Sequence, residues 1–79
     1  MKKKVYQAVI SGKSDNNIRF CDFQNLIMDL GFVFQRQNGS HIMYFNDDIG
    51  QFMNIQNDAS KAKAYEVKQL RDLIIKYNL

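Results

Sequence analysis

Two β-forming segments separated by Asn38-Gly39-Ser40 constrain the fold more than any other feature of the chain. Residues 32–37 (FVFQRQ) and 41–46 (HIMYFN) are rich in aromatic and branched side chains and alternate in polarity. An Asn-Gly pair between two such segments is typical of a tight hairpin, because both residues tolerate a positive φ. The sequence therefore predicts two antiparallel strands joined by a short turn.

A third strand is predicted directly after this hairpin. The polar residues 46–50 (NDDIG) indicate another turn, and residues 51–56 (QFMNIQ) again combine aromatic and branched side chains. Strands that follow one another through short turns pair with their neighbours in sequence. We therefore expect a three-stranded antiparallel meander.

Helices are predicted before and after the meander along the chain. Residues 18–30 carry apolar side chains at spacings of three and four, with Asn17 placed to cap this helix and Gly31 placed to end it. Residues 1–11 are expected to form a short helical appendage. Residues 64–78 predict a last amphipathic helix, whose apolar stripe contains Tyr65, Val67, Leu70, Leu73, Ile74 and Tyr77.

The element order is helix, helix, strand, strand, strand, helix within one domain of 79 residues. A three-stranded sheet has a face that must be covered, and the two longer helices carry the apolar stripes that would cover it. The predicted fold is α+β, with helices packed on one face of the antiparallel sheet.

Composition indicates a cytoplasmic domain outside the membrane. No apolar run approaches the roughly 18 residues of a membrane span, and no apolar stretch of signal-peptide type follows Lys2-Lys3-Lys4. The single cysteine, Cys21, has no second cysteine for a disulfide or a metal site, and we expect a small buried thiol on the first long helix. The net charge of +3 fits a nucleic-acid partner without requiring one.

His41 is the candidate catalytic residue and the only histidine in the chain. An imidazole exchanges protons near neutral pH, which suits general acid and base chemistry. A lone histidine is more often structural, but this one begins a strand beside Gly39 and Ser40. At such a turn the ring is expected near solvent, with backbone N–H groups close enough to receive a phosphate.

RNA cleavage also needs cations at the phosphate, and Arg36, Lys61 and Lys63 are the candidates. They help only if their segments converge on His41; taken singly, each is more often a solvated surface charge. The second proton-transfer group is left open among water, a lysine, a tyrosine and the same imidazole.

Other chemistries find less support. No zinc-ligand set, glycine-rich phosphate loop or paired nucleophile and base is recognisable, so no metal or cofactor is expected. Asp47-Asp48 is interpreted as turn chemistry. Most of the aromatic residues are expected to point into the core rather than to stack on bases; they are Phe32, Phe34, Tyr44, Phe45 and Phe52.

Taken in order, these features resemble the HicA family of toxins over nearly the whole chain. The resemblance lies in Leu30-Gly31-Phe32, the strand Phe34-Gln35-Arg36-Gln37, the turn Asn38-Gly39-Ser40-His41, a lysine-rich loop and the closing segment from Tyr65 to Arg71. Residues 11–20 also resemble the start of one branch of the family. Gly-Ser-His alone is a weak motif, and its flanks in this order make it more specific.

This resemblance implies a fold similar to the double-stranded RNA-binding domain and a metal-independent cleavage of mRNA. It also implies neutralisation by a HicB-type antitoxin, with His41 catalytic and with Gly39 and Ser40 shaping its turn. Two departures stand out: Ile42 replaces a second histidine found in many members, and Ala64 replaces a proline at the start of the last helix. Any role of a histidine pair is therefore absent here.

Two alternatives belong to other classes. The chain could be a non-catalytic RNA-binding module with the same fold, or a protein-interaction domain whose basic surface meets an acidic partner. RNA cleavage that depends on His41 separates the enzyme from both. The oligomeric state is left open by the sequence.

Overall fold

The computed structural model describes the backbone of residues 2–79 and the side chains of residues 4–79. The element order is the predicted one, which confirms the α+β class. The helices are α1 (Lys2–Ser11), α2 (Phe20–Asp29) and α3 (Ala64–Tyr77), and the strands are β1 (Val33–Asn38), β2 (His41–Asn46) and β3 (Gln51–Gln56).

The three strands form an antiparallel sheet in the order β1-β2-β3, as the meander predicts. Burial alternates along β2 and β3, because successive side chains of a strand point to opposite faces. One face is buried and contributes Ile42, Tyr44, Asn46, Met53 and Ile55 to the interior. The opposite side, here called the open face, carries by register Val33, Arg36, Asn38, His41, Met43, Phe45, Phe52, Asn54 and Gln56.

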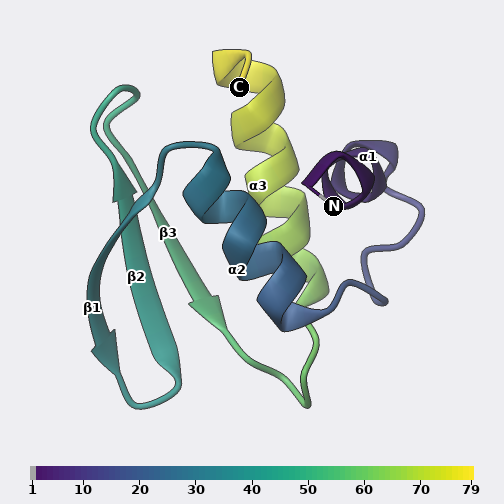
Figure 1. The fold of residues 1–79 in the computed structure, drawn as a ribbon, viewed down its shortest axis with the longest axis horizontal. Helices are drawn as coiled ribbons and strands as arrows, with labels where there is room; N and C mark the ends of the chain where they lie inside the picture. The colour runs from purple at the N-terminus through teal and green to yellow at the C-terminus, as the bar shows by residue number, and fades with distance from the viewer. Residues whose placement is uncertain (1) are drawn as a thin grey trace.

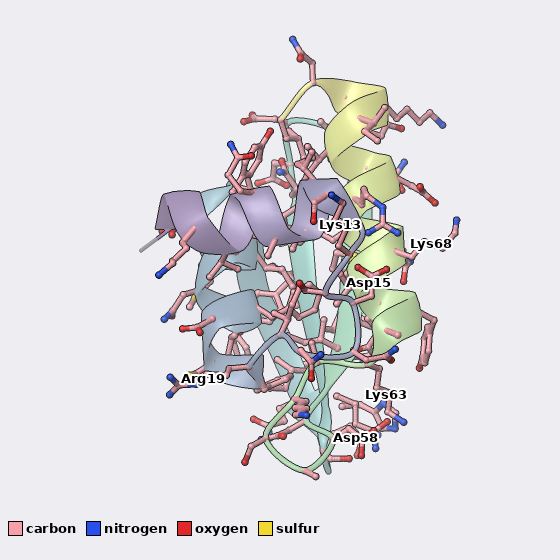
Figure 2. All side chains as sticks on the ribbon, turned by 90° about the vertical axis from the view of Figure 1, so that its right-hand side faces the viewer. Lys13, Asp15, Arg19, Asp58, Lys63 and Lys68 are labelled. Atoms are coloured by element: carbon pink, nitrogen blue, oxygen red, sulfur yellow. The ribbon has the colours of Figure 1, made fainter. Side chains whose placement is uncertain are left out.

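The helices all lie on the buried side of the sheet, in two layers (Figure 1). Helices α2 and α3 lie next to the strands, and α1 crosses both of them on the side away from the sheet (Figures 1 and 2). Val9 of α1 is fully buried within the core. Residue 1 lies outside the described residues, and the rest of the predicted helical appendage, α1, forms a third layer that joins the core.

Helix α2 begins later than the sequence predicts. Its N-cap is Arg19, without a side-chain capping bond, and Asn17 instead accepts a hydrogen bond on Oδ1 from Lys61 Nζ at 3.4 Å. Ile18 is buried in the preceding loop, where its carbonyl accepts a hydrogen bond from the Ala62 N–H at 2.9 Å. The expected cap at Asn17 is therefore wrong, because Ile18 and Arg19 pair with the 57–63 loop and the extended Arg19 stands directly before the helix.

The end of α2 confirms the role predicted for Gly31. Gly31 has a φ of +101°, and its N–H donates to the Met28 carbonyl at 3.1 Å. The Phe32 N–H donates to the Ile27 carbonyl at 3.2 Å, which completes a Schellman motif. This turn directs the chain from α2 into β1.

Two predictions about helix faces are wrong. Cys21 is exposed, because the buried side of α2 is set by Phe20, Phe23 and Leu26, and residue 21 points away from them. Tyr65 of α3 is also exposed, and its neighbour Glu66 is buried in its place. The true stripe of α3 runs through positions 66, 70 and 74, spaced by four, together with Val67.

An ion pair fastens the helical layers to one another. Arg71 of α3 donates from Nη1 to Asp15 Oδ1 at 2.9 Å and from Nη2 to Asp15 Oδ2 at 3.1 Å. Arg71 Nη1 also donates to the carbonyl of Val9 at 3.0 Å. One guanidinium thereby joins α3, α1 and the loop between α1 and α2. None of the helices in residues 2–79 has the length and apolar character needed to cross a membrane.

Candidate functional site

The turn before His41 is short and fastened to the neighbouring strand. β1 extends to Asn38, so the hairpin closes through Gly39 and Ser40 rather than through Asn-Gly. Gly39 has a φ of +63°, a conformation suited to glycine at the first central position of a two-residue hairpin turn. Ser40 Oγ accepts a hydrogen bond from Gln56 Nε2 of β3 at 3.1 Å. These contacts fix the start of β2.

His41 is exposed on the open face at that point. It is the first residue of the central strand, opposite Asn38 on β1 and Gln56 on β3. Within the described residues, no protein group forms a hydrogen bond with either ring nitrogen. The solvent access that the sequence predicts for His41 is confirmed, and its ring is not held by another group of the described residues.

Arg36 reaches the face of His41 because β1 is irregular. The register shifts between Phe34 and Arg36, which leaves Gln35 without a partner on β2. The Gln35 side chain donates from Nε2 to the carbonyls of Val33 and Phe34 at 3.2 and 3.3 Å. Strict alternation would place Arg36 on the helix side, whereas the extra residue places it opposite Met43.

Arg36 is therefore a diagonal neighbour of His41 across β1 and β2. Such positions lie about 7–8 Å apart, a gap that an arginine side chain can span. An imidazole and a guanidinium on one face can together meet a phosphodiester, the first by exchanging protons and the second by binding the anionic oxygens. The backbone register therefore brings Arg36 to the same face as His41, which is the condition that the sequence left open.

Glu66 is a buried carboxylate near this site that the sequence reasoning missed. It is 3% exposed, and its Oε1 accepts a hydrogen bond from the backbone N–H of Gln56 at 3.2 Å. Burial raises the pKa of the Glu66 carboxyl, while the Gln56 bond and the charges of Lys63 and His41 oppose that rise. The spacing of four to Leu70 and Ile74 is the sequence signal that marks this position as buried.

The two loop lysines do not act together at His41. Lys63 is close enough to Glu66 to lower the pKa of its carboxyl, as His41 also does. Lys61 lies toward the α1–α2 loop, where Nζ meets Asn17 Oδ1 at 3.4 Å. Figure 2 shows Lys63 next to the start of α3 and above Asp58 of the loop. Of the two predicted loop cations, Lys63 is therefore the one whose charge acts on Glu66, the same carboxyl on which the charge of His41 acts.

The loop that carries these lysines has an unusual backbone. Ala59 and Ser60 have φ values of +52° and +70°, in the left-handed region that non-glycine residues seldom adopt. Reciprocal hydrogen bonds of 3.0 Å between the main chains of Asp58 and Lys61 close this turn, and Asn57 Oδ1 accepts from the Ser60 N–H at 2.8 Å. The Phe20 N–H also donates to the Ser60 carbonyl at 2.9 Å. These bonds hold residues 57–63 against the start of α2.

In the described part of the chain, no three His, Cys, Asp or Glu side chains lie close enough together to hold a metal ion. Asp47 and Asp48 lie in the β2–β3 turn, as predicted. The Asp48 N–H donates to Asn46 Oδ1 at 2.9 Å, and the Asn46 side-chain amide donates to the Leu30 carbonyl at 3.2 Å. Buried Asn46 thus supports both the turn and the end of α2.

The expectation that most of the five aromatic residues enter the core is wrong, because only two of them do. Phe32 and Tyr44 are buried. Phe52 is exposed on the open face and Phe45 is half-buried beside it. Phe34 is exposed on the helix side of β1, because β1 extends beyond the cover of the helices. The sheet therefore presents aromatic surface to solvent.

Comparison of the chain with family models, with curated proteins and with solved structures gives no match. Evidence for the function therefore comes from the residues of this chain and their arrangement.

Proposed function

We propose that this protein is a cytoplasmic endoribonuclease toxin of the HicA kind, which cleaves mRNA without a metal and uses His41 as general acid and base. The observation that carries the proposal is the exposed imidazole at the start of the central strand, on the same face as Arg36. A histidine enclosed in the core would have excluded this role. The chain's net charge of +3 also favours an anionic substrate.

The proposed reaction is an internal transfer at one phosphodiester of RNA. Neutral His41 removes the proton of a ribose 2′-hydroxyl, the 2′-oxygen attacks the adjacent phosphorus, and the bond from phosphorus to the 5′-oxygen breaks. The leaving 5′-oxygen takes a proton from the protonated ring or from water. Arg36 stabilises the extra negative charge on the phosphorane oxygens. The products are a cyclic 2′,3′-phosphate and a 5′-hydroxyl end.

A HicB-type antitoxin is the partner that the resemblance implies. Its expected action is to cover the open face and so to exclude RNA from His41. The arrangement of α2, the meander and α3 supports the likeness to the double-stranded RNA-binding domain, because α2 and α3 lie next to each other on one face of a three-stranded sheet.

The deciding experiment incubates the purified protein with a long single-stranded RNA in excess EDTA, beside His41→Ala and the control Lys68→Ala. The parent and the control are expected to release fragments with 5′-hydroxyl ends. His41→Ala is expected to lose at least about a hundredfold in rate, since general acid and base catalysis contributes that much or more. Thermal unfolding checks the fold, which an exposed position should leave unchanged.

Three results would contradict the proposal. Cleavage by His41→Ala at the parental rate would remove the role of His41. Inhibition of the parent by EDTA would show that the reaction depends on a metal. Absence of cleavage by the folded parent, with RNA bound equally by both variants, would favour the second candidate, a non-catalytic RNA-binding module. The aromatic surface of the open face is the observation that favours that candidate.

A further inference from the structure

The open face is divided along its length into an aromatic end and a cationic end. Phe45 of β2 lies opposite Phe52 of β3 at the end next to the β2–β3 turn. His41 lies opposite Gln56 at the other end, with Arg36 beside it on β1. Met43 and Asn54 form the pair in between. The two ends are four residues apart on β2, or about 13 Å along a strand.

The aromatic end keeps a large ring surface in contact with water. The ring centroids of Phe45 and Phe52 are 4.5 Å apart with an interplanar angle of 47°, and Phe52 is 51% exposed. The helices cover the opposite side of the sheet, so no element of the described chain packs over these rings. Such a platform of rings on a sheet is suited to stacking with a flat ligand.

The remaining side chains of the open face indicate the kind of ligand. Its members include the amides Asn38, Asn54 and Gln56 and the basic residues Arg36 and His41, and they include no carboxylate. Amides offer donors and acceptors that match base edges, and the cations match phosphate. The nearest acidic pair, Asp47 and Asp48, lies in the turn beyond the aromatic end. Phosphates are therefore favoured toward His41 and bases toward Phe52.

We propose that the open face is the RNA-binding surface and that it takes an unpaired segment, with one base stacked on Phe52 and a phosphate held by Arg36 beside His41. The position of the cleaved phosphate beside His41 rests on the proposed function, whereas the stacking site at Phe52 does not. A duplex hides the faces of its bases within the helix, so Phe52 has access only to unpaired nucleotides. The surface is accordingly selective for single strands.

Phe34 provides a matched control for Phe52. It is the same residue type and is 53% exposed, but it lies on the helix side of β1 with its ring edge against Tyr44. Substitution of either residue by alanine removes a similar exposed apolar surface. Only Phe52 lies on the open face, so only Phe52→Ala should affect RNA that binds there.

The test measures fluorescence anisotropy of a labelled single-stranded RNA, and of the same RNA in a duplex, in a His41→Ala background that prevents cleavage. Phe52→Ala is expected to weaken binding of the single strand by about 5- to 150-fold, the range measured for one base–aromatic stack. Phe34→Ala should leave binding within about twofold of the parent. Phe52→Tyr should restore it, and the duplex should bind more weakly and respond little to Phe52→Ala.

Equal affinity of Phe52→Ala and Phe34→Ala for the single strand would overturn the proposal and leave the face for a protein partner. Duplex binding as tight as single-strand binding would overturn its selectivity. The result is independent of turnover. If the protein with His41 intact fails to cleave while Phe52 still governs binding, the enzymatic function fails and the stacking site stands.

Discussion

Asp15 and Glu66 are two carboxylates held against the core in opposite ways. Both oxygens of Asp15 are paired, at 2.9 and 3.1 Å, with the guanidinium of Arg71. This hydrogen-bonded partner raises the pKa of Arg71 still further, so the guanidinium stays positively charged. The site keeps some access to water, since the Asp15 and Arg71 side chains are 20% and 17% exposed.

Glu66 is more deeply buried and less well paired. One oxygen accepts a backbone hydrogen bond from Gln56, while Lys63 and His41 act on it through their charges without forming an ion pair within 4 Å among the described residues. Burial therefore outweighs the favourable contacts and raises the pKa of its carboxyl. The charge of Asp15 thus fastens helices together, whereas the charge of Glu66, next to the candidate site, destabilises the fold when the carboxyl ionises.

The largest expected effect comes from breaking the Arg71 pair. Arg71→Met removes both bonds to Asp15 and the bond to the Val9 carbonyl, and it leaves a partly buried carboxylate unpaired. We expect the free energy of unfolding at neutral pH to fall by about 2–3 kcal/mol, less than for a fully buried pair because the site is partly hydrated. Urea denaturation followed by circular dichroism measures this change.

The control for that prediction removes the unpaired charge as well. Arg71→Met with Asp15→Asn should recover part of the lost stability, because no ionised carboxylate then remains without its partner. A loss below about 0.5 kcal/mol in the single variant would show that Arg71 behaves as a surface residue. The proposed fastening of α1 to α3 would then be wrong.

The difference between these sites also explains what the sequence could predict. Local patterns determine the hairpin, the third strand and the Gly31 helix end, because periodicity and turn residues act over a few neighbours. They place His41 at a strand entry on the same grounds. The pairing of Asp15 with Arg71 joins residues 56 positions apart, and no local pattern reports it.

The missed features of the candidate site are consequences of tertiary packing. The irregularity at Gln35 places Arg36 on the open face, although strict alternation would place it on the other side. Glu66 escapes the sequence reasoning because carboxylates are seldom buried. Asn17 fails as a helix cap because the 57–63 loop pairs with the segment before α2. The Asn17 error thus has its cause in a contact between segments distant in sequence.

A smaller effect, and one that depends on pH, is expected at Glu66. Its folded pKa lies above the ordinary value of 4.5, so the folded chain binds this proton more tightly than the unfolded chain. The resulting stabilisation is complete below pH 4.5 and is lost as the pH rises through the folded pKa. Glu66→Gln imitates the protonated form and should remove this loss.

Urea denaturation of the parent and of Glu66→Gln between acidic and neutral pH tests this sign. The glutamine variant should gain stability relative to the parent as the pH rises, and its side-chain carbonyl can still accept the bond from the Gln56 N–H. Glu66→Ala leaves that N–H without a partner and should instead be less stable than the glutamine variant, by about 1–3 kcal/mol. Stability of the parent that rises relative to Glu66→Gln over this range would contradict the raised pKa.

The smallest effect is expected at Lys68 and Asp72. This ion pair is exposed to solvent, so it shows what a pair contributes without burial. Their atoms Nζ and Oδ2 are 3.2 Å apart, nearly as close as in the Arg71 pair, but the side chains are 66% and 61% exposed. Lysine stands N-terminal to the acid, the weaker orientation for an i, i+4 pair. Lys68→Ala should change the free energy of unfolding by no more than about 0.5 kcal/mol, and 1 M salt should abolish the coupling in a double-mutant cycle with Asp72→Ala. A coupling as large as that of Arg71 with Asp15 would mean that distance alone sets the strength of these pairs and that burial does not strengthen them.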